Sequence, residues 1–307
     1  MSSFHPSFGL ATAFVGLSAA SLSFPAFAAD ITVTHAQGET VVAENPQKVI
    51  TFDLASLDTL DALGVEIAGL PGSNLPGYLQ KFAADSYLKV GSLFEPDYEA
   101  VAAAAPDLII VAGRSSAAYS ELSKIAPTID LSNDWADFEG SIKENSLILG
   151  EIFGKTTEVE AMIAELDDKI AAIKADAADA GTGLVVLTTA GEVTAYGPGS
   201  RFGWIHDSLG IAPAAEQVEI ANHGDAISFE FILEANPDWL FVIDREAAVA
   251  GVGSAEAVLD NELVNQTSAV EAGHVVAIDP VRAYIINGGL PAFTVLVDQI
   301  GTALAAQ

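Results

Sequence analysis

Short aliphatic runs recur along the chain and alternate with stretches of helical spacing. The runs lie at residues 49–52, 65–70, 108–112, 184–188, 240–243 and 275–278. Nearly continuous apolar runs are typical of parallel strands, because helices cover both faces of a parallel sheet. The alternation of such strands with helices therefore predicts an α/β fold with mainly parallel sheets.

A long helical stretch separates these runs into two groups. Its apolar residues recur at helical spacing: Val159, Ile163, Leu166, Ile170 and Ile173. A helix over residues 156–178 would be about 34 Å long, enough to run between two lobes. The sequence thus predicts an N-terminal lobe of residues 29–155, an inter-lobe helix of residues 156–178 and a C-terminal lobe of residues 179–307.

The first 28 residues have the composition of a secretory signal peptide. They contain no Asp, Glu, Lys or Arg, and Ala26-Phe27-Ala28 forms an A-x-A cleavage pattern. The chain has no Cys, which excludes disulfides, a thiol nucleophile and a lipid-carrying Cys after the cleavage site. We therefore expect cleavage near Ala28 and a mature protein free in the periplasm.

The net charge of the chain excludes some classes of binding partner. There are 12 Lys and Arg against 42 Asp and Glu, a formal net charge of −30. A chain this acidic does not bind nucleic acid or an anionic membrane through a general electrostatic field. We expect membrane contact only through a membrane protein partner.

The few arginines are placed unusually. There are four, and each follows a strand-like run: Arg114, Arg201, Arg245 and Arg282. The planar guanidinium suits anionic oxygen ligands. One such Arg would be interpreted as a surface ion pair, but three of them, Arg114, Arg201 and Arg245, favour an anionic ligand held in a cleft.

A hidden repeat supports two related lobes. The pattern Glu-x6-Pro-Asp-x6-Arg runs from Glu99 to Arg114 and again from Glu230 to Arg245, an offset of 131 residues. Each copy predicts a short helix that ends at Pro, a strand, and an Arg just beyond the carboxyl end of the strand. Ligands of parallel α/β sheets bind at that end. Both Arg residues are therefore expected at a ligand cleft, with each Glu near the same rim.

His223 and Tyr284 are candidates for contact with a metal. Both lie on predicted loops, His223 in an Asn-His-Gly turn and Tyr284 after a strand. Phenolate oxygen suits hard Fe³⁺, and imidazole is an acceptable nitrogen donor. Two residues cannot complete a six-coordinate iron, but they could fill two positions on iron already held by a four-oxygen chelator. A lone loop His or Tyr is more often a surface residue, so the residue types alone leave the question open.

Several segments together resemble a known family. They are residues 45–50 (NPQKVI), 52–58 (FDLASLD), 106–110 (PDLII), 222–224 (NHG) and 228–230 (SFE), followed by Asp279-Pro280, Tyr284 and Gly288-Gly289. With these segments the mature chain resembles the periplasmic ferric-siderophore-binding proteins of ABC importers, in particular the branch that binds ferric catecholates. One departure is Arg282-Ala283 beside Tyr284, where that family more usually has an aromatic residue.

The resemblance implies a fold and a site. The fold would be that of a class III periplasmic binding protein, with two Rossmann-like lobes bridged by one long α-helix. Arg114, Arg201 and Arg245 match the basic residues of the pocket. His223 and Tyr284 match the pair that coordinates the iron of the bound siderophore.

The resemblance also implies partners. Glu99 and Glu230, one on each lobe, would dock on Arg residues of the permease of an ABC transporter. The ligand would be an Fe(III)-siderophore of the catecholate type, and we expect a tetradentate one because a hexadentate chelate leaves no position for His223 or Tyr284. We expect a monomer with no intrinsic cofactor.

Other functions fit the sequence less well. A haem or cobalamin carrier of the same fold is the alternative, although three Arg residues favour a compact ligand with several negative charges. A secreted hydrolase is disfavoured because the chain has no G-x-S-x-G, no H-E-x-x-H and no Cys. A surface adhesin is disfavoured by the cleavage pattern and the lack of an anchor. The sequence therefore predicts a binding protein and not an enzyme.

Overall fold

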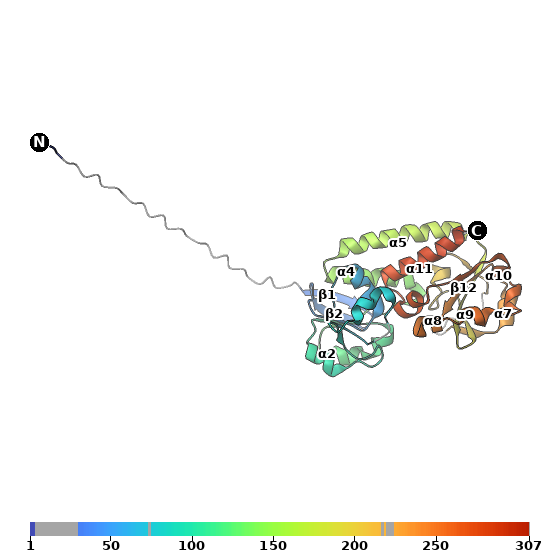
Figure 1. The fold of residues 1–307 in the computed structure, drawn as a ribbon, viewed down its shortest axis with the longest axis horizontal. Helices are drawn as coiled ribbons and strands as arrows, with labels where there is room; N and C mark the ends of the chain where they lie inside the picture. Colours follow the sequence, from blue (N-terminus) through green and yellow to red (C-terminus); the bar gives the residue numbers. More distant parts are fainter. Residues whose placement is uncertain (4–29, 73–74, 216–217, 219–223, 307) are drawn as a thin grey trace.

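The structure is a computed structural model that describes residues 1–3, 30–72, 75–215, 218 and 224–306. Most of the predicted signal peptide and the candidate ligand His223 lie outside these residues. The described chain forms two α/β lobes side by side, with α2 in one and α7 to α10 in the other (Figure 1).

The N-terminal lobe has a sheet of five parallel strands in the order β5-β4-β3-β6-β7. Its strands are β3 (Val49–Thr51), β4 (Gly69–Leu70), β5 (Leu88–Lys89), β6 (Leu108–Val111) and β7 (Thr128–Asp130). The chain grows outward in one direction from β3 and then returns to place β6 on its other side. In such sheets the crevice for a ligand opens where the direction reverses, beyond the carboxyl ends of β3 and β6.

Helical segments cover this sheet, and a hairpin precedes it. The segments are α1 (Leu54–Ala62), η1 (Gly77–Ala83), α2 (Tyr98–Ala104), η2 (Gly113–Ala118), α3 (Tyr119–Leu122), η3 (Trp135–Asp137) and α4 (Phe138–Ile152). The hairpin of β1 (Asp30–His35) and β2 (Gly38–Ala43) was not predicted. The Thr40 hydroxyl donates to the Thr128 carbonyl at 3.0 Å, which ties the hairpin to β7.

The C-terminal lobe has a mixed sheet in the order β11-β9-β8-β12-β13, with β10 also paired to β8. Its strands are β8 (Thr182–Thr189), β9 (Glu192–Tyr196), β10 (Ala212–Pro213), β11 (Asp225–Ile227), β12 (Trp239–Asp244) and β13 (Val275–Ala277). β8, β12 and β13 are parallel, as predicted, and β10 adds a parallel strand that was not predicted. β9 is antiparallel to its neighbours. The two-residue turn Ala190-Gly191 has positive φ at both positions (50° and 86°), the geometry that returns a strand beside itself.

The helical segments of this lobe are α6 (Trp204–Asp207), α7 (Phe229–Ala235), α8 (Arg245–Ala250), α9 (Ala255–Leu259), η4 (Val264–Gln266), α10 (Ser268–Ala272) and η5 (Val281–Ile286). The last, η5, is a turn of π-helix. It is followed by the long helix α11 (Leu290–Ala305).

Two segments join the lobes, one more than the sequence predicted. The predicted helix is α5 (Thr156–Ala177), which runs along both lobes with α11 beside it (Figure 1). The chain reaches α11 through η5, and Ile286 and Ala292 pack into the core of the N-terminal lobe. Farther along α11, Ile300 packs with Ile173 of α5 in a core that continues into the C-terminal lobe. The C-terminal segment thus crosses back between the lobes, while the predicted division of the chain at residues 155 and 179 stays a prediction.

The two copies of the repeat fold alike. Helix α2 begins after Asp97 and α7 after Ser228, each of which caps the helix with its side chain. Both helices have seven residues and end at a residue in the left-handed region, Ala105 (φ 45°) and Asn236 (φ 40°). The caps and the ends therefore keep the offset of 131 residues found in the sequence.

The Asp of each copy fastens the sheet. Asp107 accepts hydrogen bonds from the backbone N–H groups of Gln47 (3.0 Å) and Lys48 (2.8 Å), just before β3. Asp238 accepts from the N–H and the hydroxyl of Thr182, at 2.7 and 3.0 Å, where β8 begins. In both lobes the repeat thus joins one central strand to its neighbour and fixes where the following Arg lies.

None of the helices formed by the described residues has the length and apolar character needed to cross a membrane.

Candidate functional site

A cleft of about 580 Å³ lies where the two lobes meet. Residues that follow β3, β6 and β7 line it from the N-terminal lobe, among them Asp53, Arg114 and Trp135. Arg201 and Tyr284 line it from the later part of the chain. The cleft is therefore at the carboxyl ends of the strands, where the sequence placed a ligand.

Three arginines surround the ring of Tyr284. The guanidinium carbons of Arg201, Arg245 and Arg114 lie 4.5, 5.6 and 5.8 Å from the centre of the ring. These distances lie within the range of cation–π attraction between a guanidinium and the face of an aromatic ring. The structure thus brings together four of the five residues predicted to contact a ligand, and the fifth, His223, is outside the described residues.

Arg114 is fastened to the backbone of the Tyr284 turn. Its Nη2 donates to the Tyr284 carbonyl at 2.7 Å and its Nη1 to the Ile285 carbonyl at 3.3 Å. Burial lowers the pKa of the guanidinium. The preceding Gly113 has a positive φ of 43°, and its N–H donates to the Ser132 hydroxyl at 2.7 Å, so the loop that carries Arg114 is itself held in place.

Arg201 is the most buried of the three arginines, with 8% of its surface exposed. Its Nη2 donates to the Tyr284 carbonyl at 2.9 Å, and its buried Nε has no hydrogen-bond partner among the described residues. Burial lowers its pKa, and the charge of Arg114 lowers it further. A buried cation with few hydrogen bonds is costly unless an anion offsets it, so this position favours an anionic ligand.

Arg245 differs because it contacts the phenol instead of the backbone. Its Nε donates to the Tyr284 hydroxyl oxygen at 3.0 Å, and this bond raises the pKa of Arg245. Burial alone would raise the pKa of Tyr284, but the hydrogen bond from Arg245 and the charges of Arg201 and Arg245 outweigh it, so the pKa lies below its usual value. Loss of the phenolic proton is therefore easier here than in a free tyrosine.

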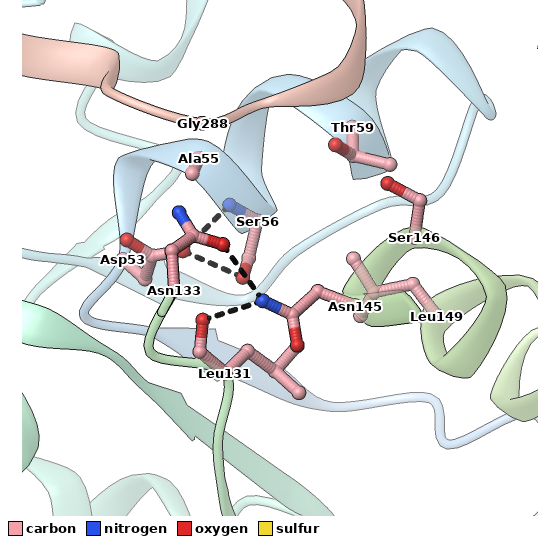
Figure 2. Close-up of a pocket in the computed structure, with 10 residues that line it drawn as sticks. All are labelled: Asp53, Ala55, Ser56, Thr59, Leu131, Asn133, Asn145, Ser146, Leu149 and Gly288. Carbon is pink, nitrogen blue, oxygen red and sulfur yellow. Dashed lines mark hydrogen bonds between the residues drawn. The ribbon is translucent and has the colours of Figure 1, made fainter. Parts of the chain in front are cut away.

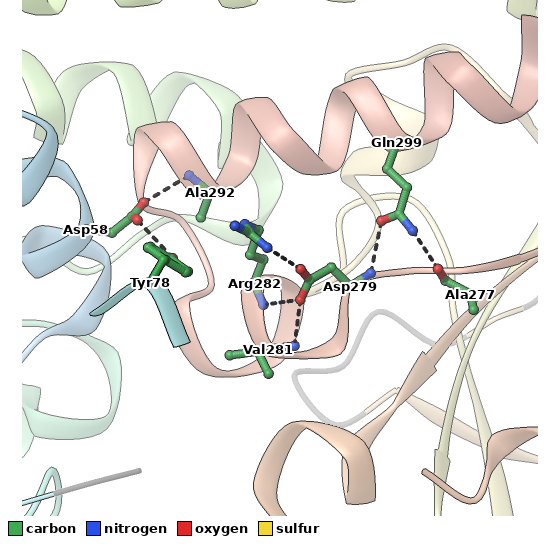
Figure 3. Close-up of polar contacts among 8 residues, drawn as sticks. All are labelled: Asp58, Tyr78, Ala277, Asp279, Val281, Arg282, Ala292 and Gln299. Carbon is green, nitrogen blue, oxygen red and sulfur yellow. Dashed lines mark hydrogen bonds and ion pairs between the residues drawn. The ribbon is translucent and has the colours of Figure 1, made fainter. Parts of the chain in front are cut away.

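Polar contacts from both lobes hold the turn that presents Tyr284 (Figure 3). Asp279 accepts hydrogen bonds from the N–H groups of Val281 (3.1 Å) and Arg282 (3.0 Å), and its carboxylate pairs with the Arg282 guanidinium. The Arg282 guanidinium lies 4.7 Å from the ring centre of Tyr78 in the N-terminal lobe. Arg282 therefore stands apart from the other three arginines and fastens the turn instead of facing the cleft.

The chain of contacts in Figure 3 continues to α1. The Tyr78 hydroxyl donates to Asp58 at 2.9 Å, and Asp58 also accepts from the Ala292 N–H at the start of α11 at 2.9 Å. Burial raises the pKa of Asp58 to about 6, although both hydrogen bonds oppose the shift. A buried carboxylate of α1 thus caps α11, whose own cap residue, Gly289, has no side chain.

A second set of contacts holds the chain just after Tyr284, and Figure 2 shows the part of it between Asn145 and Asn133, beside Gly288. Asn145 donates to the Asn133 side-chain oxygen at 3.0 Å, and Asn133 donates to the Asn287 carbonyl at 3.3 Å. Gly288 has a φ of 121°, and a Cβ there would lie 2.2 Å from the Asn133 amide nitrogen. The small polar pocket that Asn133, Asn145 and Gly288 line has a volume of about 10 Å³, close to that of one water molecule.

The two predicted docking residues lie outside the cleft. Glu99 and Glu230 are exposed, each in the first turn of its helix. Hydrogen bonds from its own backbone N–H and from Ser228 lower the pKa of Glu230. Their equivalent places in the two lobes match the repeat, and contact with a permease stays a prediction.

Two histidines of the C-terminal lobe, His206 and His274, have structural surroundings. His206 is buried, and its Nδ1 lies 2.8 Å from the Ile211 carbonyl oxygen. The ring of His274 stacks on Trp239 with centroids 4.1 Å apart. Within the described ranges, no group of three or more His, Asp or Glu side chains is arranged to hold a metal ion.

Sequence reasoning missed some of the residues that shape the site. Phe94 and Trp135 line the cleft, and Asn133 supports the Tyr284 turn. Phe94 lies in a short loop before the first copy of the repeat, and Trp135 just after β7. Their proximity to the carboxyl ends of strands was the one available signal, and it applies to many other residues.

Comparison with known proteins assigns the fold. Residues 49–281 match the family described as periplasmic binding protein. The chain is 43% identical over 279 residues to the petrobactin-binding protein YclQ of Bacillus subtilis, covering 89% of this chain and 88% of that one. It is 35% identical over 277 residues to the ferric-anguibactin-binding protein FatB of Vibrio anguillarum, covering 88% and 86%.

Solved structures of similar proteins have the same fold as this chain. The crystal structure of YclQ superposes with a TM-score of 0.86 and covers 90% of this chain and 99% of that one, at 43% identity. The periplasmic catecholate-siderophore binding protein VctP of Vibrio cholerae superposes with a TM-score of 0.84 at 32% identity, covering 91% and 100%. The predictions of family and of a two-lobed α/β fold are therefore confirmed.

Proposed function

Because the chain belongs to the periplasmic binding protein family, we propose that it captures an Fe(III)-siderophore of the catecholate type and delivers it to an ABC transporter of the inner membrane. Proteins of this family bind ligands and are not enzymes, so the chain is a binding protein. Its relatives are named for petrobactin and ferric anguibactin, and a structural neighbour for catecholate siderophores.

The observation that carries the proposal is the convergence of Arg114, Arg201 and Arg245 on Tyr284. Ferric catecholates carry several negative charges on their oxygens, and charge-assisted hydrogen bonds from guanidinium groups suit such oxygens. The partly buried cleft strengthens these bonds by excluding water. The same convergence fits a compact multi-anionic chelate better than the large porphyrin-like ring of haem or cobalamin.

In the proposed complex, Tyr284 and His223 coordinate the iron of a tetradentate chelate. A tetradentate bis-catecholate leaves two of the six positions on iron open, and a phenolate and an imidazole fill them. The lowered pKa of Tyr284 favours the phenolate. In the described structure the Tyr284 oxygen accepts a hydrogen bond from Arg245, so binding of iron exchanges that bond for a metal bond.

The test uses the fluorescence of Trp135, which lines the cleft. The mature protein is titrated with a ferric tetradentate bis-catecholate, a ferric hexadentate tris-catecholate and haem. We expect tightest binding of the tetradentate complex, and a catecholate-to-iron absorption band that changes on binding. Tyr284→Phe should shift this band, and His223→Ala should weaken binding of the tetradentate complex alone. Equal affinity for both chelates, with an unchanged band in both variants, would refute direct coordination.

Delivery requires contact with the permease. Glu99 and Glu230, exposed at equivalent places of the two lobes, make this contact with Arg residues of the transporter. A Glu99→Ala/Glu230→Ala double variant should bind the ferric chelate normally and fail to support iron uptake by cells. Glu95→Ala/Glu234→Ala is the matched control, because it removes two exposed carboxylates nearby. Normal uptake with the first double variant would exclude the docking role.

The proposed location is the periplasm, after cleavage near Ala28. Mass determination of the mature protein tests it: an N-terminus at Ala29 is expected, and a chain that retains residues 1–28 would contradict it.

A further inference from the structure

We propose that Phe94 is a specificity-determining residue, which forms an aromatic wall of the cleft and selects chelates whose iron-binding groups are aromatic rings. This inference rests on the proposed function, because it concerns the ligand of the same cleft. It adds a criterion that the arginines do not supply, since guanidinium groups bind the oxygens of carboxylate and catecholate chelates alike.

Phe94 lies at the tip of a tightly built loop. The hydroxyl of Ser92 accepts hydrogen bonds from the N–H groups of Phe94 (3.3 Å) and Glu95 (2.9 Å), and the Ser92 N–H donates to the Glu95 carbonyl at 2.9 Å. At its base, Gly91 has a φ of 96°, and a Cβ there would lie 2.4 Å from the Glu95 carbonyl oxygen. The loop is therefore a defined structure that holds its tip in one place.

The tip exposes its aromatic ring although the neighbouring residue is partly buried. Leu93 packs against the core of the N-terminal lobe, whereas Phe94 lines the cleft and is 70% exposed. The hydrophobic effect is proportional to the apolar area removed from water, so a ring that stays mostly exposed contributes little to folding. A loop that presents this ring in a cleft lined by Arg114 and Arg201 points to a bound group with a flat apolar face.

Trp135 supplies a second aromatic side chain to the same cleft. It is partly buried, and its ring lies 5.5 Å from that of Phe138, tilted by 30°, so it is supported from behind. A catechol ring combines anionic oxygens at one edge with two apolar faces. The arginines of the cleft can donate hydrogen bonds to the oxygens of such a chelate. The aromatic side chains can contact its rings, because offset or edge-to-face contacts between aromatic rings are favourable. The cleft therefore matches this class of chelate.

The test compares three variants of the mature protein. Phe94→Ala removes the ring, Phe94→Tyr keeps it, and Val252→Ala is the matched control, since Val252 is also 70% exposed and does not line the cleft. Affinities for a ferric bis-catecholate and for ferric citrate, which has no ring, are measured by quenching of intrinsic fluorescence. Thermal unfolding of each variant confirms that it folds.

We expect Phe94→Ala to weaken binding of the bis-catecholate about three- to tenfold, with Phe94→Tyr and Val252→Ala within twofold of the unmodified protein. Affinity for ferric citrate should not change in any variant. If the unmodified protein binds the bis-catecholate and Phe94→Ala binds it equally well, the inference is wrong while the proposed function stands. If the unmodified protein binds no ferric chelate, both fail.

Discussion

The two copies of the repeat build the same scaffold and end in arginines with different surroundings. In each lobe a seven-residue helix ends at a left-handed residue, an Asp fastens the neighbouring strand, and an Arg follows the next strand. Arg114 then donates to two backbone carbonyls, and burial lowers its pKa. Arg245 donates to the phenol oxygen of Tyr284, and its pKa is raised.

This difference gives the two arginines different roles. We call Arg114 part of the frame, because it holds the backbone of the site, and Arg245 a contact, because it binds a side chain that lines the cleft. The carbonyls that Arg114 binds belong to the turn that carries Tyr284, so this Arg fixes the position of the site. We expect the Tyr284 phenol to give up its hydrogen bond from Arg245 when it binds iron, so that Arg245 can then donate to the ligand. The repeat sets where each Arg lies, and the residues around it decide what it does.

Among the predicted effects, the largest should follow from removal of Arg114, the arginine of the frame. We expect Arg114→Ala to lower the affinity for a ferric catecholate tenfold or more. It should also lower the free energy of unfolding by about 1–3 kcal/mol, because the Ile285 carbonyl loses its donor and the Tyr284 carbonyl keeps only its bond from Arg201. Fluorescence titration and urea denaturation measure the two quantities. An affinity loss without a stability loss would make Arg114 a contact like Arg245.

The carboxylate that caps α11 gives a pH-dependent test of the same frame. Burial raises the pKa of Asp58 to about 6, whereas Asp in an unfolded chain titrates near 3.9. The folded protein therefore holds this proton more tightly, and the stability that it contributes is present below about pH 4 and lost as the pH rises through about 6.

Asp58→Asn should remove this dependence. The difference in free energy of unfolding between the unmodified protein and the variant should fall by about 2–3 kcal/mol from pH 4 to pH 7.5, since each unit of pKa shift corresponds to about 1.4 kcal/mol. Urea denaturation across this range measures it, and the shared acidic residues cancel in the difference. Parallel curves for the two proteins would show that Asp58 is not a buried carboxylate of raised pKa.

Removal of Arg245, the contact residue, should lower ligand affinity and leave the stability of the protein unchanged. Arg245→Ala is expected to lower the affinity for a ferric catecholate about tenfold, the loss of one charge-assisted hydrogen bond. Its free energy of unfolding should stay within about 0.5 kcal/mol of the unmodified value, as for most surface changes. A clear loss of stability would assign Arg245 to the frame as well.

The smallest expected difference is in stability, between the two Asp residues that fasten a strand in each lobe. Asp107 is exposed and Asp238 is partly buried, although both accept two hydrogen bonds where a strand begins. We expect Asp238→Ala to destabilise the protein by about 1 kcal/mol more than Asp107→Ala, because unpaired donors cost more when they are less accessible to water. Equal losses in thermal or urea unfolding would show that the two lobes fasten their strands with equal strength.

Local patterns predicted the fold well where one segment determines its own structure. The aliphatic run at residues 108–112 became β6, and the helical spacing after residue 156 became α5. The antiparallel β9 was missed because Ala190-Gly191 lacks the Asn or Asp that usually marks such a turn. The crossing of α11 back to the N-terminal lobe was missed because burial against a distant core leaves no local pattern.

The site was predictable in part for the same reason. The repeat and the strand ends predicted Arg114 and Arg245 at a ligand cleft; in the structure Arg114 lines the cleft, and Arg245 contacts the hydroxyl of Tyr284, which lines it. No sequence pattern states that Arg114 would bind the carbonyls beside Tyr284, or that Arg282 would face Tyr78, because these contacts join residues more than 150 positions apart. The role of Tyr284 toward iron and the roles of Glu99 and Glu230 stay predictions.

A crystal structure of the mature protein with a ferric tetradentate bis-catecholate tests the central claim most directly. We predict iron in the cleft, bound by the Tyr284 phenolate in place of the Arg245 hydrogen bond. Arg245 and Arg201 should donate to catecholate oxygens, while Arg114 keeps its bonds to the Tyr284 and Ile285 carbonyls. A chelate bound elsewhere, or one in the cleft with the Arg245–Tyr284 hydrogen bond intact, would contradict the account.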